Sequence, residues 1–171
     1  MPDSPIPVVM PRLQPQYLPI REAGGFWAGT RAWMRSRRQW QLAEDWHYQL
    51  PDRTPVVIPA GFVTDGASAP RPFWPFMPPV GPLLIPSLIH DFAYCYDYLW
   101  TTDGANSYRK HREGAGRDYW DSLFHEIGLR LVGRNLFTAP AYQVIRFTGR
   151  KAWRDKRRQH CPELRPGSLA D

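Results

Sequence analysis

The stretch PSLIHDFAYCYDYLW, residues 86–100, decides the fold of this chain of 171 residues. Its apolar residues recur at helical spacing, so the pattern predicts an amphipathic helix over the whole stretch. His90 and Asp91 are neighbours on this helix, offset by about 100°, and therefore cannot pair with each other. Tyr94 lies one turn after His90 on the same face, where its hydroxyl can enter the same polar pocket.

Two more helices are expected after this stretch. Residues 116–132 place apolar side chains in one stripe, and residues 138–158 begin with a Thr cap and a proline in the first turn. The second of these helices has a basic outer face. Asp121 lies beside the apolar stripe of the first, where a buried carboxylate needs a partner, and a histidine on the facing helix is a natural one.

The N-terminal half predicts loops and a small sheet. Residues 1–24 alternate proline with apolar residues, which suits an extended arm of the kind that often lies on a neighbouring subunit. Residues 40–48 and 54–58 flank a polar break and predict a β-hairpin. Residues 59–86 contain eight prolines and three glycines, which predicts a long ordered loop. Residues 103–116 are polar and predict a connection.

The expected fold is therefore an α-rich α+β fold, with a small N-terminal β-hairpin or sheet packed on two antiparallel helices plus a third, C-terminal helix. We expect a proline-rich arm with a short Trp/Arg segment at 1–39, one globular domain at 40–158 and a C-terminal tail at 159–171. A single domain of this length buries about two-thirds of its unfolded surface, so no disulfide scaffold is needed.

Composition excludes several classes of protein. The chain is 43% hydrophobic with eight Trp, eight Tyr and eight Phe, which is a globular composition. No apolar run reaches the roughly 20 residues of a transmembrane span, and no signal peptide is evident at the N-terminus. Cys95 and Cys161 have no metal-ligand spacing, so free thiols are expected.

The net charge is +6, and much of it comes from residues 31–38 and 150–158. Such basic segments invite nucleic acid or anionic lipid as partners, but a solvated basic face is the simpler interpretation. We therefore do not expect nucleic acid as a partner.

A candidate cation site precedes the first helix. Asp65 lies in the turn GFVTDGASAP, residues 61–70, where a loop can supply carboxylate and carbonyl oxygens to a hard cation. Asp65 and Asp91 would give it two charged ligands. Spacing alone favours structural roles, because a lone His-Asp pair is more often a core histidine beside a capping aspartate. Ser68 could act as a nucleophile with His90, but its context lacks the strand-turn-helix of a nucleophile elbow.

Four segments together resemble known families. They are TDGASAP at 64–70, HDFAY at 90–94, Arg117-x-x-x-Asp121-x-x-Phe124 and YQVIRFTG at 142–149. Their order is similar to that in the small bacterial and fungal phospholipases A2. Residues 40–153, which include the loop IPAGFVTD, also resemble an uncharacterised family of short proteins frequent in phage and prophage genomes.

The phospholipase resemblance implies a role for each residue. His90 would be the general base that takes a proton from water, and Asp121 would orient the imidazole. Tyr94 would brace Asp121. Asp65 and Asp91, with the carbonyl oxygen of Gly66, would hold Ca²⁺. The substrate would be a phospholipid or another ester.

The phage resemblance keeps other functions open. The competing interpretation is a virion or tail protein that keeps the fold without turnover and binds other phage structural proteins, or itself, through the arm. A third is a peptidoglycan or nucleic-acid hydrolase that uses the same site. The expected location is the host cytoplasm or the virion. Fold alone does not separate these interpretations.

Overall fold

The computed structural model describes residues 9–16, 39–64, 83–103, 107–133, 138–158 and 161–167. These residues form two antiparallel sheets and three helices, which confirms the predicted α+β class. One sheet has the strand order β1 (Leu13–Gln16), β2 (Gln39–Leu42) and β5 (Val63–Thr64). The other has the order β3 (Trp46–Gln49), β4 (Pro55–Ile58), β6 (Leu99–Thr102) and β7 (Tyr108–His111). The helices are α2 (Leu84–Tyr96), α3 (Arg117–Val132) and α4 (Thr138–Arg158).

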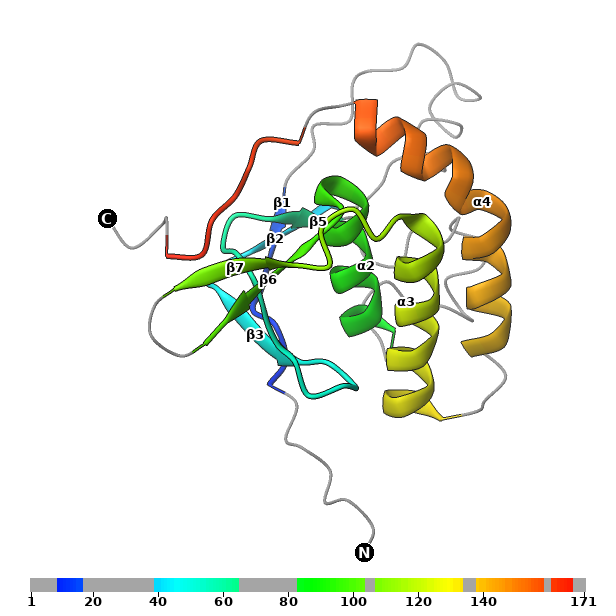
Figure 1. Cartoon of the computed structure of the whole chain (residues 1–171), viewed down its shortest axis with the longest axis horizontal. Coiled ribbons are helices and arrows are strands. Elements are labelled where there is room, and N and C mark those ends of the chain that lie inside the picture. The colour runs from blue at the N-terminus through cyan, green and yellow to red at the C-terminus, as the bar shows by residue number, and fades with distance from the viewer. Residues whose placement is uncertain are drawn as a thin grey trace, which may run out of the picture.

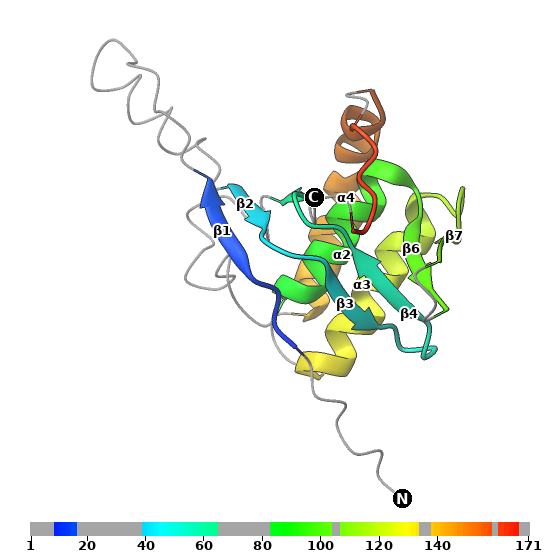
Figure 2. The ribbon, with the colours of Figure 1, turned by 90° about the vertical axis from the view of Figure 1, so that its left-hand side faces the viewer.

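The helices are arranged side by side next to the strands. The strands lie on one side of α2, and α3 and then α4 follow on the other (Figure 1). Figure 2 shows the strands in front of the helices after a quarter turn. Leu88 and Phe92 of α2 are fully buried, as are Trp120 and Ile127 of α3, so these two helices and the larger sheet share one apolar core. Its burial is the main force that holds the layers together.

The predicted hairpin is present, but its first strand is only Trp46–Gln49, because the chain bends at 43–45 and residues 39–42 form β2 in the other sheet. Strands β3 and β4 pair antiparallel, with Trp46 opposite Ile58. Arg53 has a positive φ of 69°, and the amide of Leu50 donates to the carbonyl oxygen of Thr54, which closes the turn. The second strand is buried along its length from Val56 and belongs to the apolar core that α2 and α3 share.

The first predicted helix is shorter than the sequence pattern suggested. Helix α2 ends at Tyr96, because Asp97 adopts a left-handed conformation and its amide donates to the carbonyl oxygen of Ala93. Leu99 and Trp100, expected on the helix, belong to strand β6 instead. The spacing of Leu99 matched the helical stripe by coincidence, and pairing with two strands decided its conformation.

A second hairpin was missed. Strands β6 and β7 pair from Leu99 opposite His111 to Thr102 opposite Tyr108, within the region that was expected to be a connection. Its second strand, YRKH, is mostly exposed and therefore has no apolar alternation that would reveal a strand.

Both ends of the described chain lie against the domain. Strand β1 pairs with β2, and the indole of Trp46 donates to the carbonyl oxygen of Val9 at 2.7 Å. Near the C-terminus, the carbonyl oxygen of Leu164 accepts from Trp100 at 2.9 Å, and the amide of Gly167 donates to Asp45 at 2.6 Å. The expected arm and tail thus each contribute residues that pack on the domain.

The structure describes both cysteines of the chain. Cys95 and Cys161 are free thiols, and burial raises the pKa of Cys95 to about 12, which disfavours its thiolate form. Within the described ranges, no helix is long and apolar enough to cross a membrane.

Candidate active site

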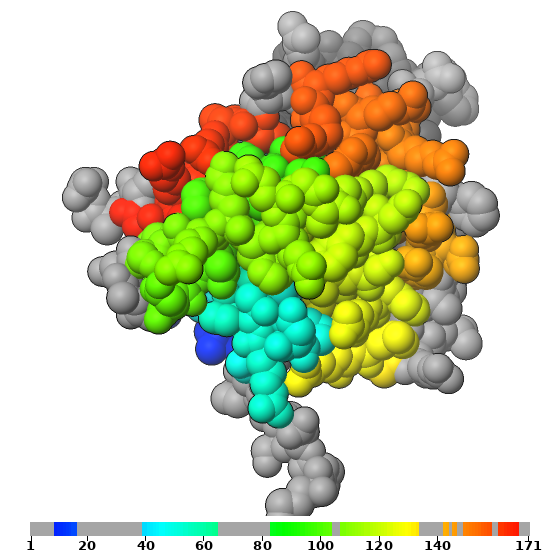
Figure 3. Space-filling view, viewed as in Figure 1, coloured from blue at the N-terminus to red at the C-terminus, as the bar shows by residue number. Residues whose placement is uncertain are grey.

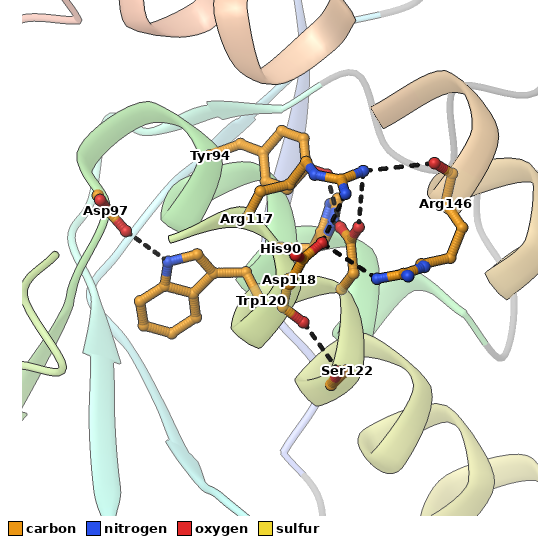
Figure 4. A network of polar contacts seen from close by, with 9 residues as sticks. His90, Tyr94, Asp97, Arg117, Asp118, Trp120, Ser122 and Arg146 are labelled. Carbon is orange, nitrogen blue, oxygen red and sulfur yellow. Dashed lines mark hydrogen bonds and ion pairs between the residues drawn. The ribbon is translucent and has the colours of Figure 1, made fainter. Parts of the chain in front are cut away.

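The site lies where helices α2 and α3 run antiparallel. Asp97, directly after α2, accepts hydrogen bonds from the amide of Gly116 at 3.0 Å and from the indole of Trp120 at 2.8 Å. These two bonds tie the end of α2 to the start of α3, and Figure 4 shows the one between Asp97 and Trp120. They fix the register of the helices, which brings His90 opposite Asp121.

Asp121 is the centre of the polar contacts. Its side chain is fully buried, and one oxygen, Oδ1, binds both Nε2 of His90 at 3.0 Å and the hydroxyl of Tyr94 at 2.5 Å. The other oxygen, Oδ2, accepts no hydrogen bond from a described residue but forms an ion pair with Nη1 of Arg117 at 3.5 Å. A buried carboxylate needs such compensation, because desolvation penalises its charge.

His90 is held in the neutral form. Its side chain is 9% exposed, and its ring lies between those of Tyr94, 4.0 Å away, and Phe124, 5.5 Å away. Burial lowers the pKa of His90 below its usual 6.5, while the hydrogen bond and the charge of Asp121 oppose this shift. A neutral imidazole donates from Nε2 to Asp121, which leaves Nδ1 as an acceptor without a partner among the described residues.

Arg117 connects the site to α4. Its guanidinium pairs with Asp118 through Nη2 at 2.5 Å and donates through Nη1 to the carbonyl oxygen of Arg146 at 3.3 Å. Arg146 in turn pairs with Asp118 at 3.1 Å. Figure 4 shows Arg117 between Tyr94 and Arg146. Arg117 thus links the buried carboxylate of Asp121 to the exposed Asp118 and to the backbone of α4. We call Asp118 and Arg146 the rim of the site.

Tyr94 stays protonated and acts as a donor. Burial, followed by the hydrogen bond and charge of Asp121, raises its pKa well above the ordinary value of 10. Its hydroxyl also lies against the backbone of α4 at Gly149, which is buried. A Cβ atom at Gly149 would lie 2.6 Å from the Tyr94 hydroxyl oxygen and 3.7 Å from Nη1 of Arg117. Glycine is therefore required there for the close approach of α4.

Gly149→Ala is expected to lower the free energy of unfolding by about 1–3 kcal/mol, because the new methyl group displaces the Tyr94 hydroxyl from Asp121. Chemical denaturation measures the change. In the background of Tyr94→Phe the same substitution should be milder, because the nearest remaining ring atom is 3.7 Å away. Equal effects of Gly149→Ala in both backgrounds would show that the hydroxyl contact is not the cause.

The candidate cation ligands are only partly described. Asp91 is half-buried on α2, and the hydroxyl of Thr64 at the end of β5 donates to its Oδ2 at 2.5 Å. Asp65 and Gly66 lie outside the described residues, as do Ser68 and the arm segment 17–38. In the described part of the chain, no group of three or more His, Cys, Asp or Glu could hold a metal ion.

The described part of the chain also contains His111 and His125. His125 stacks on Tyr142 of α4, with ring centroids 4.4 Å apart. His111 is at the end of β7. Among the described residues, neither forms a hydrogen bond with His90.

Sequence reasoning missed two residues that shape the site. Asp97 was treated as part of a helix, and no sequence signal marks an aspartate as a left-handed helix end. Gly149 was quoted within the segment YQVIRFTG, but its close approach to Tyr94 depends on how α4 packs. Arg117 was noted only as part of a motif, although its place one turn before Asp121 on the same helix was a usable signal for an ion pair.

Comparison with known proteins gives one match. A family model described as a protein of unknown function, DUF1353, matches residues 40–137, which is more than half of the chain. No curated protein and no solved structure matches. The matched region contains both helices that carry His90, Tyr94 and Asp121, together with the strands that support them. The protein therefore belongs to the DUF1353 family, whose members have no assigned function.

Proposed function

We propose that this protein is an ester hydrolase of phospholipase A2 type in which His90 is the general base. The observation that carries the proposal is the fully buried Asp121, which binds Nε2 of His90 and the hydroxyl of Tyr94 at one oxygen. A histidine with one nitrogen anchored on a buried carboxylate, and the other without a partner among the described residues, is arranged to take a proton from water.

The chemistry follows from this arrangement. Nδ1 of His90 removes a proton from a water molecule, whose oxygen attacks the carbonyl carbon of the ester. The resulting imidazolium is stabilised by the negative charge of Asp121. When the tetrahedral intermediate collapses, the carbon–oxygen bond to the alcohol breaks and His90 returns the proton to the departing oxygen. The products are a carboxylic acid and an alcohol, and the imidazole is neutral again.

Asp91 is the described residue that would bind a cation. Its carboxylate lies one position after His90 on α2 and is held by the hydroxyl of Thr64, directly before Asp65 in the chain. Oxygen ligands of this kind suit Ca²⁺, and Asp65 and the carbonyl oxygen of Gly66 would complete the set. When bound, Ca²⁺ would polarise the ester carbonyl and offset the charge of a substrate phosphate.

The resemblance of residues 40–153 to proteins of phage and prophage genomes supports a role in phage infection. In the proposal, the protein is phage-encoded and acts in the host cytoplasm or as part of the virion. The competing role is that of a virion or tail protein that keeps the His-Asp network only for stability. Turnover is the property that separates the two.

Calcium removal tests the proposal. We expect the purified full chain to release fatty acid from phosphatidylcholine with Ca²⁺ present, and a chelator to lower the rate by about a hundredfold or more. Titration calorimetry should detect Ca²⁺ binding that Asp91→Asn weakens, and this readout does not depend on turnover. Absence of hydrolysis of both phospholipids and soluble short-chain esters with Ca²⁺ would overturn the enzymatic proposal in favour of the structural role.

A further inference from the structure

Helix α4 is the most basic of the described helices. It contains seven basic residues and one acidic residue, Asp155, so its formal charge is +6, equal to the net charge of the chain. The rest of the sequence is therefore balanced. The basic residues are Arg146, Arg150, Lys151, Arg154, Lys156, Arg157 and Arg158.

Most of these basic side chains face solvent without acidic partners. Arg150, Lys151, Arg154, Arg157 and Arg158 are exposed, and none of them forms an ion pair with another described residue. Arg157 lies over the ring of Trp153, 5.6 Å from its centroid, and donates to the carbonyl oxygen of Cys95 at 3.4 Å. A charge cluster that the described residues do not neutralise can attract an external anion.

The cluster is a stripe that begins at the candidate active site. Arg146, Arg150, Arg154 and Arg158 follow at intervals of four residues, so they share one side of α4 over about 18 Å. The first of them contacts Arg117 and Asp118 at the rim of the site. In Figure 3 the C-terminal half of α4, in orange, forms a continuous part of the molecular surface next to α3.

We propose that the exposed residues Arg150, Lys151, Arg154, Arg157 and Arg158, which continue from Arg146 along α4 and are called the α4 basic face, dock the protein on anionic lipid bilayers. The inference rests on the proposed function, because a hydrolase of phospholipids must act where its substrate lies. Clusters of four to eight basic residues on one helix are typical of binding to acidic headgroups.

The docking would be electrostatic and shallow. The only exposed apolar residue between Arg150 and Arg158 is Ala152, so little apolar area is available for insertion. Binding should therefore weaken steeply as salt rises, because screening shortens the reach of surface charges. The α4 basic face would hold Arg117, Asp118 and the neighbouring active site close to the lipid headgroups.

Vesicle sedimentation of the full chain tests the docking. We expect binding to vesicles of equal parts phosphatidylcholine and phosphatidylglycerol, and no binding to phosphatidylcholine alone. The triple variant Arg150→Gln/Arg154→Gln/Arg158→Gln should bind the anionic vesicles about a hundredfold more weakly. The matched control Arg12→Gln/Arg53→Gln/Arg109→Gln removes the same charge outside α4 and should bind like the parent protein.

Two further measurements separate this inference from the proposed function. His90→Ala should bind vesicles like the parent protein, because docking does not need turnover. The triple α4 variant should hydrolyse a soluble short-chain ester at the parental rate, with an unchanged thermal unfolding midpoint.

Three outcomes would overturn the docking proposal. They are equal binding to both kinds of vesicle, equal losses in the two triple variants, and binding to duplex DNA but not to anionic vesicles. If vesicle binding is as expected but no ester is cleaved, docking stands and the proposed function fails. If esters are cleaved without vesicle binding, the reverse holds.

Discussion

Replacing His90 by Ala is expected to lower kcat/KM for phospholipid hydrolysis by about 10²- to 10⁴-fold, because the substitution removes the proposed general base. The measurement is the rate of fatty-acid release by the full chain with Ca²⁺ present. Binding of substrate should change much less, since the imidazole acts on water rather than on the lipid.

A matched control uses another histidine. His47 is exposed on strand β3, and His47→Ala should leave the rate unchanged. Circular dichroism and thermal unfolding establish that both variants fold. A His90→Ala protein that folds and retains parental activity would remove His90 from the mechanism.

The pH dependence of activity gives an independent test of the same base. The pKa of His90 is lowered by burial, so the acid limb of kcat/KM should have its midpoint below 6.5. Activity is present above that midpoint and is lost as the pH falls through it, because protonation of Nδ1 blocks proton transfer from water. A midpoint above 6.5 would contradict a buried histidine as the base.

Asp121→Ala is expected to give the largest loss of stability, about 3–5 kcal/mol. The substitution leaves Nε2 of His90 and the hydroxyl of Tyr94 without their buried acceptor, and Arg117 loses one of its two ion pairs. Each unsatisfied buried group contributes a desolvation penalty. Urea denaturation monitored by tryptophan fluorescence measures the change in free energy of unfolding.

Asp118 provides the matched control on the same helix. Its side chain is 74% exposed and pairs with Arg117 and Arg146. Asp118→Ala should therefore cost less than about 1 kcal/mol, because exposed ion pairs contribute little. Similar losses for the two variants would mean that the buried network around Asp121 is not a centre of stability.

Periodicity was sufficient for the helices of the site. The stripe of α3 from Trp120 to Ile127 is strong, and its predicted range of 116–132 matches the observed Arg117–Val132 closely. The hairpin β3–β4 also followed from the pattern, because a polar turn separates two apolar runs. The helix and the hairpin each form from residues that are close in the sequence, so their patterns of apolar and polar residues were sufficient to predict them.

Features that depend on distant pairing could not be predicted in this way. The apolar residues of strand β6 continue the helical spacing of α2, which directly precedes it. The strand nevertheless pairs with β4, more than forty residues earlier in the sequence. Strand β7 is mostly exposed and has no apolar alternation. In both cases the partner strand decided the conformation.

By itself, the sequence determined that α2 and α3 form. It also determined that α2 carries His90 and that α3 carries Asp121. Only the tertiary structure decided that these side chains meet. The turn at Asp97 sets the register of the two helices, and Gly149 lets a third helix close over Tyr94. The physical reason is that a buried carboxylate is stable only when several distant groups compensate it together, and no local pattern records that combination.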